Sequence, residues 1–188
     1  MDVRLSVREQ APIDLLVSRV LLVELDTELV DVLRQPEIQR VLEAVEPGVG
    51  TALQRPWTAA REDAAREEYA RLFLLPKGVP PFASAWIEGE REELGAQLTT
   101  FISRLMTVLD REIEHGHQGN LPLDHLGLLL ELSGTAALDE HPTHQRAAAH
   151  LQAEALGPWV GQFGRALQRN ARLPIYRAIG GLLAQLYG

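Results

Sequence analysis

Cysteine is missing from the 188 residues of this chain, and Lys77 is the only lysine. The lack of cysteine excludes disulfide frameworks, thiolate zinc sites and cysteine nucleophiles, and it suits a reducing compartment. The formal net charge is -8, and the arginines do not cluster along the sequence. Because nucleic acids require a basic surface, we expect no nucleic-acid partner, and a basic partner is more natural.

Long uninterrupted apolar runs are also missing. Asp14, Arg19 and Glu24 interrupt the apolar sequence near the start of the chain, which excludes a membrane span and a signal-peptide core there. We therefore expect a cytoplasmic protein. Hydrophobic residues make up 46% of the chain and charged residues 23%, as in ordinary folded proteins. The length fits a single domain over residues 1–188, either undivided or two-lobed.

Alternating β-branched segments are absent, whereas apolar residues recur almost everywhere at helical spacing. The sequence therefore predicts the all-α class, a helical bundle without strands. Proline and glycine positions divide the pattern into seven expected helices. These helices cover residues 12–34, 36–45, 58–75, 88–114, 122–138, 143–169 and 173–187.

The stretch "PLDHLGLLLEL", residues 122–132, begins with a vicinal acid and imidazole. We expect Asp124 in the first turn of its helix, where a carboxylate gains about 0.3 to 1 kcal/mol from the helix dipole. Helical spacing then places Leu128 and Glu131 on the face of Asp124, while His125 points elsewhere. This face is suited to a cation attached to an apolar segment, and simple capping by Asp124 is the alternative interpretation.

Several segments from roughly residue 69 to residue 187 resemble segments of one known family and follow each other in the same order. They read "EYARLF", "VPPFASAW", "LPLDHLGLLLEL", "LGPWVGQF" and "LPIYRAIGGLLAQL". Together they resemble the TorD/DmsD family of redox-enzyme maturation chaperones. The chain departs from the family pattern at Ala83 and Trp86 in the loop, and at Leu123 and Leu129 around the Asp-His pair. These departures concern which protein the chaperone binds more than membership of the family.

The resemblance implies a non-enzymatic cytoplasmic chaperone without a cofactor of its own. Such a protein binds the precursor of a molybdenum-cofactor oxidoreductase and its twin-arginine signal peptide, and holds it until the cofactor is inserted, before export. A twin-arginine leader joins two guanidinium groups to an apolar stretch, so its receptor needs an apolar groove with carboxylates at one end.

We assign the arginine contact to Asp124 first and Glu131 second, and expect His125 to orient or hydrogen-bond the peptide backbone. Asp124 and His125 would both face a solvent-accessible groove. The other peptide-binding candidates are Phe82, Ser84, Trp86, Leu128, Trp159 and Tyr176. For Trp159 and Tyr176, core packing is the favoured alternative. The family exchanges halves between protomers, so the connector near residues 115–121 is the candidate hinge for a domain-swapped homodimer.

Two other classes of function remain open. Six histidines, among them the "HGH" and "HPTH" stretches and His125, allow a histidine-ligated metal-dependent enzyme. A generic helical adaptor module fits the composition equally well. Enzymes that bind phosphate or a dinucleotide through glycine-rich loops are disfavoured because no glycine spacing matches them, and Ser84 lacks the context of a hydrolase nucleophile.

Overall fold

The computed structural model describes residues 5–87, 100–104, 107 and 121–188. The chain divides into two compact units. The first unit consists of Met1–Leu22 and Pro81–Trp159, and the second of Val23–Pro80 and Val160–Gly188. Apart from one isolated β-bridge, the regular elements of the described residues are all helical, so the predicted all-α class is confirmed. The single-domain assignment stays a prediction, and residues 115–120 of the expected hinge lie outside the described ranges.

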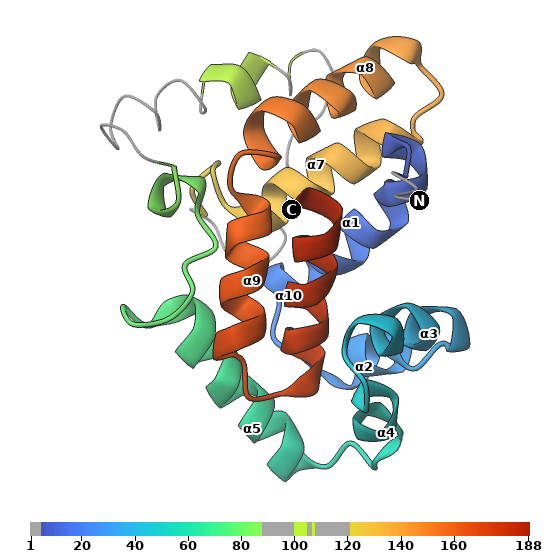
Figure 1. The fold of residues 1–188 in the computed structure, drawn as a ribbon, viewed down its shortest axis with the longest axis vertical. Coiled ribbons are helices and arrows are strands. Elements are labelled where there is room, and N and C mark those ends of the chain that lie inside the picture. Colours follow the sequence, from blue (N-terminus) through green and yellow to red (C-terminus); the bar gives the residue numbers. More distant parts are fainter. Residues whose placement is uncertain (1–4, 88–99, 105–106, 108–120) are drawn as a thin grey trace. The chain divides into compact units, whose positions relative to one another are not determined.

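The first unit is built on the packing of α1 (Val7–Leu22) along α7 (Leu126–Leu138), which Figure 1 shows together with α8 (Pro142–His150). Glycine lets α1 and α7 approach closely: a Cβ at Gly134 would lie 2.7 Å from Leu15 Cγ. The buried Ser18 hydroxyl donates to the Gly127 carbonyl at 2.7 Å, which joins the two helices by a polar contact as well. These contacts fix the start of α7, where the site lies.

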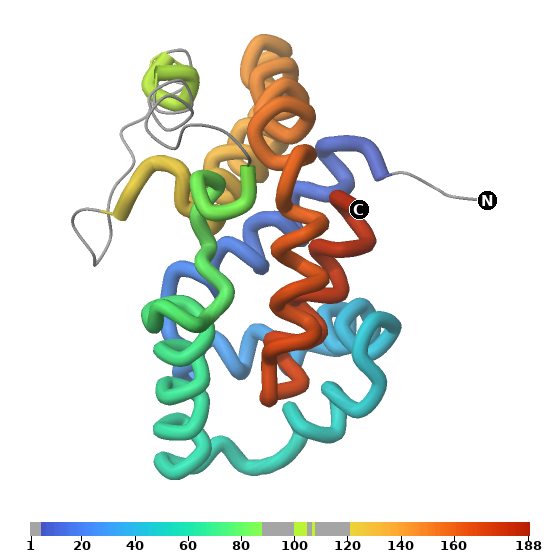
Figure 2. Tube along the Cα trace, turned by 60° about the vertical axis from the view of Figure 1, so that its left-hand side comes forward, coloured from blue at the N-terminus to red at the C-terminus, as the bar shows by residue number. Residues whose placement is uncertain are grey.

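In the second unit, α9 (Val160–Asn170) and α10 (Pro174–Tyr187) run side by side in both views (Figures 1 and 2). A Cβ at Gly164 would lie 2.6 Å from the Gly180 carbonyl oxygen, so the two backbones meet where only glycine fits. Four further helices complete this unit. They are α2 (Thr27–Leu33), α3 (Pro36–Val45), α4 (Val49–Gln54) and α5 (Ala59–Tyr69), which continues as the π-helix η1 (Ala70–Leu74).

Several predicted helix bounds are wrong. The expected helix 12–34 is two helices, because Asp26 accepts the Leu29 N–H at 2.7 Å and caps a new start. The expected helix 143–169 is interrupted by the π-helix η3 (Leu151–Leu156) and by a turn at Pro158, where the sequence already indicates a bend because proline lacks a backbone N–H. The helices predicted at 36–45 and 173–187 are confirmed within one residue. Most of the predicted helix 88–114 lies outside the described residues, although 100–104 are helical.

Within the part of the chain that the structure describes, no helix combines the length and the apolar character needed to cross a membrane.

Candidate functional site

The candidate site is a junction in the first unit between the proline-rich loop and the start of α7. Phe82 and His125 form an isolated antiparallel bridge. Around it, the Leu126 N–H donates to the Pro81 carbonyl at 2.7 Å, and the Ala83 N–H donates to the Asp124 carbonyl at 3.1 Å. The loop therefore has a defined backbone position against the segment that carries the Asp-His pair.

Asp124 lies before the helix rather than in its first turn. The first residue of α7 is Leu126 and its N-cap is His125, because the chain makes a turn in which the His125 N–H donates to the Pro122 carbonyl at 3.0 Å. The predicted helix start at Pro122 and the first-turn position of Asp124 are therefore wrong. The half-buried carboxylate instead accepts the Ser84 N–H at 3.1 Å, across the junction.

His125 is the N-cap of α7 and is only 4% exposed, so the expectation that it faces a solvent-accessible groove is wrong. Its Nδ1 accepts the Gly127 N–H at 3.1 Å, and its ring meets Phe82 edge to face, with centroids 5.3 Å apart. Burial lowers the pKa of His125 to about 4, although the nearby Asp124 carboxylate opposes the shift. The imidazole is thus neutral at physiological pH and holds the junction together.

The sequence predicts that Asp124, Leu128 and Glu131 share one helix face. Helical spacing does not place Asp124 on that face, because Asp124 precedes the first residue of α7. Leu128 is buried, at 6% exposure, whereas Glu131 is exposed on α7. Glu131 therefore remains available to a ligand, and Leu128 packs in the core of its unit.

The aromatic candidates separate into two groups. Phe82 and Trp86 are half-buried on the loop that carries Ser84. Trp159 is fully buried, and its indole N–H donates to the Ala155 carbonyl at 2.7 Å. Tyr176, in the second unit, is also fully buried, with its ring centroid 5.7 Å from that of Phe73. Burial of this kind agrees with the core-packing interpretation of Trp159 and Tyr176.

Backbone groups that the side-chain motifs do not reveal build the junction. Pro81 and Asp124 supply carbonyl acceptors to the opposite segment, and Gly127 donates to the capping imidazole. The spacing of His125 and Gly127, two residues apart at the beginning of an apolar run, is a signal for such a cap, since a side-chain acceptor at the N-cap binds an amide of the first turn.

The histidines of the described residues form no group of three potential metal ligands with each other or with acidic residues. His141 and His144 have ring centroids 5.0 Å apart, and His144 Nδ1 lies 2.9 Å from Asp139 Oδ2. The His141 Nδ1 accepts the Thr143 N–H at 3.3 Å and caps α8. The pair thus has a local role in the turn between α7 and α8, while His115 and His117 lie outside the described ranges.

Comparison with known proteins identifies the family. The family model described as "Nitrate reductase delta subunit" matches residues 34–165, which include the loop, the junction and α7. The curated "Chaperone protein YcdY" of Escherichia coli (strain K12) is 31% identical over 117 residues, which cover 61% of this chain and 56% of that relative. The match thus spans little more than half the length of the relative. The chain belongs to the nitrate reductase delta subunit family, the TorD-like chaperone family that its motifs resemble.

Proposed function

We propose that this chain is a maturation chaperone that binds the precursor of a molybdenum-cofactor oxidoreductase and its twin-arginine leader, and holds both until the cofactor is inserted before export. Membership of the family and the likeness to a curated chaperone support the general activity. The finer proposal, recognition of an arginine-bearing peptide, rests on the chemistry of the junction.

The observation that carries this proposal is the state of Asp124. Its carboxylate is half-buried and accepts one backbone N–H, that of Ser84, and no cationic side chain among the described residues pairs with it. A sheltered carboxylate of this kind gains most from a guanidinium group, whose paired N–H donors match its two oxygens. An arginine of the leader would supply a positive charge that the residues described by the structure do not place there.

The surroundings of Asp124 favour binding of an extended peptide. Phe82 and Trp86 are half-buried on the loop whose Ser84 N–H binds the carboxylate, and aromatic rings can stack on guanidinium groups or cover apolar side chains. The hydrogen bonds to the Pro81 and Asp124 carbonyls already fix the loop, so the loop loses little conformational entropy when a peptide binds.

The predicted site residues take different parts in this proposal. Asp124, Ser84, Phe82 and Trp86 form the contact region, and Glu131 on α7 offers a second, exposed carboxylate. His125 positions the loop through its cap and its contact with Phe82. Three predicted contact residues are buried in the core and would not touch the peptide. They are Leu128, Trp159 and Tyr176.

Asp124→Asn tests the proposal, because the amide oxygen can still accept the Ser84 N–H while the charge is removed. A charge-assisted hydrogen bond contributes about 1.5 to 3 kcal/mol, so affinity for a synthetic twin-arginine leader should fall roughly ten- to one-hundred-fold. Fluorescence anisotropy of a labelled peptide measures the change.

Glu140→Gln is the matched control, since it removes an exposed carboxylate of the turn between α7 and α8. This control should leave the affinity within about two-fold, as expected for a distant, solvent-screened charge. Equal losses in both variants would mean that the leader responds to net charge alone, and unchanged binding by Asp124→Asn would refute the site.

A further inference from the structure

The second unit distributes its charges very unevenly along the chain. All its acidic residues lie between Glu24 and Glu68. The remaining segments, 69–80 and 160–188, contain no Asp or Glu and carry every cation of the unit that follows Glu68. These cations are Arg71, Lys77, Arg165, Arg169, Arg172 and Arg177. The net charge of the chain is -8, yet every charged residue of these two segments is a cation.

Two of these cations are neutralised within the unit. Arg71 Nε lies 2.7 Å from Glu68 Oε2, and Arg177 Nε lies 2.7 Å from Glu46 Oε1. The other four have no ion pair with any residue that the structure describes. We call these four the cationic face: Lys77, Arg165, Arg169 and Arg172.

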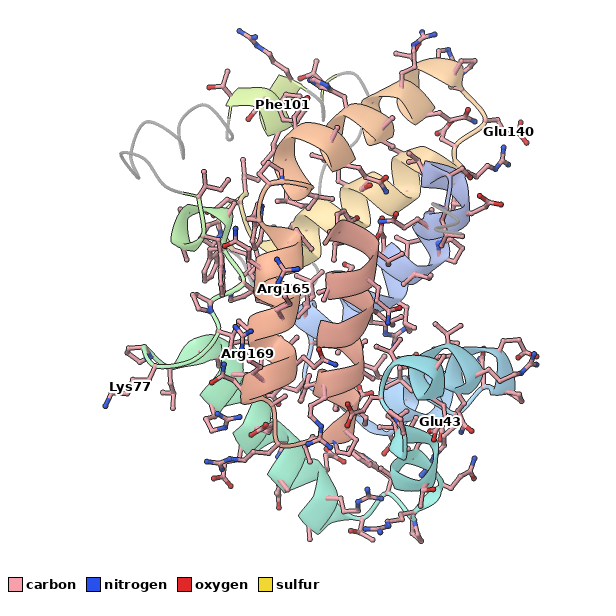
Figure 3. All side chains as sticks on the ribbon, viewed as in Figure 1. Glu43, Lys77, Phe101, Glu140, Arg165 and Arg169 are labelled. Atoms are coloured by element: carbon pink, nitrogen blue, oxygen red, sulfur yellow. The ribbon has the colours of Figure 1, made fainter. Side chains whose placement is uncertain are left out.

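The cationic face draws its residues from two segments that contact each other. Arg165 and Arg169 are exposed one turn apart on α9, whose opposite side buries Phe163 and Leu167. The loop with Lys77 follows η1, and η1 is tied to the end of α9 because Arg71 Nη2 donates to the Asn170 carbonyl at 2.8 Å. In Figure 3 the labelled arginines lie on α9, and Lys77 extends outward from the loop that follows η1.

Arg165, Arg169 and Arg172 lie within eight residues of the sequence, so the expectation that the arginines do not cluster is wrong for this segment, and folding adds the loop with Lys77. Like charges one turn apart on a helix repel each other by a few tenths of a kcal/mol. The acidic residues of the unit, which would relieve this repulsion, pair elsewhere or lie in other segments. The face therefore remains positively charged on an acidic protein, and it will attract anionic groups.

An apolar feature lies on the same loop. Leu74 and Leu75 are 65% and 57% exposed, the highest values among the large hydrophobic side chains described. A tight turn holds them outward: the Gly78 N–H donates to the Leu75 carbonyl at 2.9 Å, and the Val79 N–H donates to the Leu72 carbonyl at 2.6 Å. The two leucines are therefore presented to solvent by a defined backbone conformation, as in contact surfaces.

We propose that the cationic face, together with Leu74 and Leu75, docks an acidic segment of a partner polypeptide that also carries apolar side chains. Charge complementarity selects the acidic segment, and the exposed leucines select a polypeptide rather than a nucleic acid, because a phosphate backbone gains nothing from aliphatic contacts. This docking surface goes beyond the proposed leader site, since it uses only residues of the second unit and binds groups of opposite charge.

The test uses the full chain and a labelled synthetic peptide of glutamate and leucine, with a glutamine and leucine peptide as its uncharged counterpart. Arg165→Gln with Arg169→Gln should weaken binding of the acidic peptide roughly five- to thirty-fold, as expected for the loss of two exposed ion pairs of about 0.5 to 1 kcal/mol each. Leu74→Ser with Leu75→Ser should weaken it as well. The uncharged peptide should bind the wild-type chain more weakly than the acidic one.

Arg8→Gln with Arg55→Gln is the matched control, because it removes two exposed arginines outside the cationic face and changes the net charge equally. This variant should bind the acidic peptide within about two-fold of wild type. Three outcomes would overturn the proposal: equal losses in both arginine variants, no binding of the acidic peptide, or sedimentation showing that the leucines instead join two copies of the chain.

Discussion

His125 should make the stability of this protein depend on pH. The imidazole is 4% exposed, and its Nδ1 accepts the Gly127 N–H at 3.1 Å. A protonated imidazole has no acceptor nitrogen, so protonation would remove the cap of α7 and place a charge in a buried position. Burial therefore lowers the pKa of His125 from 6.5 to about 4, and the Asp124 carboxylate only partly opposes this shift.

The sign of the effect follows from proton binding. Between about pH 6.5 and 4 the unfolded chain binds a proton at His125 and the folded chain does not, so acidification favours unfolding. The stabilisation is complete above about pH 6.5, falls as the pH decreases to about 4, and changes no further below that. Linkage gives a loss of about 2 kcal/mol between pH 7 and pH 5, and about 3 kcal/mol over the whole range.

His125→Asn isolates this contribution, because asparagine retains a side-chain acceptor suited to the N-cap but does not titrate. Urea unfolding followed by far-UV circular dichroism gives the free energy of unfolding of both proteins at several pH values from 7 to 4.5. Between pH 7 and pH 5, the free energy of unfolding of the wild type should fall by about 2 kcal/mol relative to that of the variant. Parallel pH profiles would refute the neutral, buried state of His125.

Two further predictions concern packing and polar contacts within the units. Gly134→Ala should lower the free energy of unfolding by about 1 to 3 kcal/mol, because a Cβ there would lie 2.7 Å from Leu15 Cγ and 3.0 Å from the Ala11 carbonyl oxygen. Thermal or urea unfolding measures this loss of stability. A variant as stable as the wild type would mean that α1 can move away from α7. Glu68→Gln should also lower the free energy of unfolding by about 1 to 3 kcal/mol, because the buried carboxylate accepts hydrogen bonds from Arg71 and, at 2.6 Å, from the Arg172 N–H. An unchanged midpoint of urea unfolding would contradict this role.

The fold class was predictable because helical periodicity is a local property of the sequence. The exact bounds were not. Asp26 starts a new helix inside the apolar pattern from 12 to 34, and the π-helical turns at 70–74 and 151–156 preserve the apolar periodicity closely enough to be hidden. A cap or an extra residue per turn changes hydrogen bonding without changing which side chains are apolar.

The candidate site was predictable in its residues but not in its geometry. The motif identified Asp124, Phe82 and Ser84, which the structure does bring together at one junction. The burial of His125 could not be read from the sequence, because it results from a loop forty residues earlier in the chain that covers the imidazole. The sequence likewise does not show that the segment before Lys77 contacts the end of α9, although Arg165, Arg169 and Arg172 are close together in the chain.

The recognition of an arginine by Asp124 can be measured by a double-mutant cycle. It combines wild type and Asp124→Asn with a twin-arginine leader in which one or the other arginine is replaced by glutamine, and titration gives the four dissociation constants of each cycle. We expect a coupling free energy of about 1 kcal/mol or more between Asp124 and one of the two arginines. Additive effects, with no coupling to either arginine, would contradict the proposed contact.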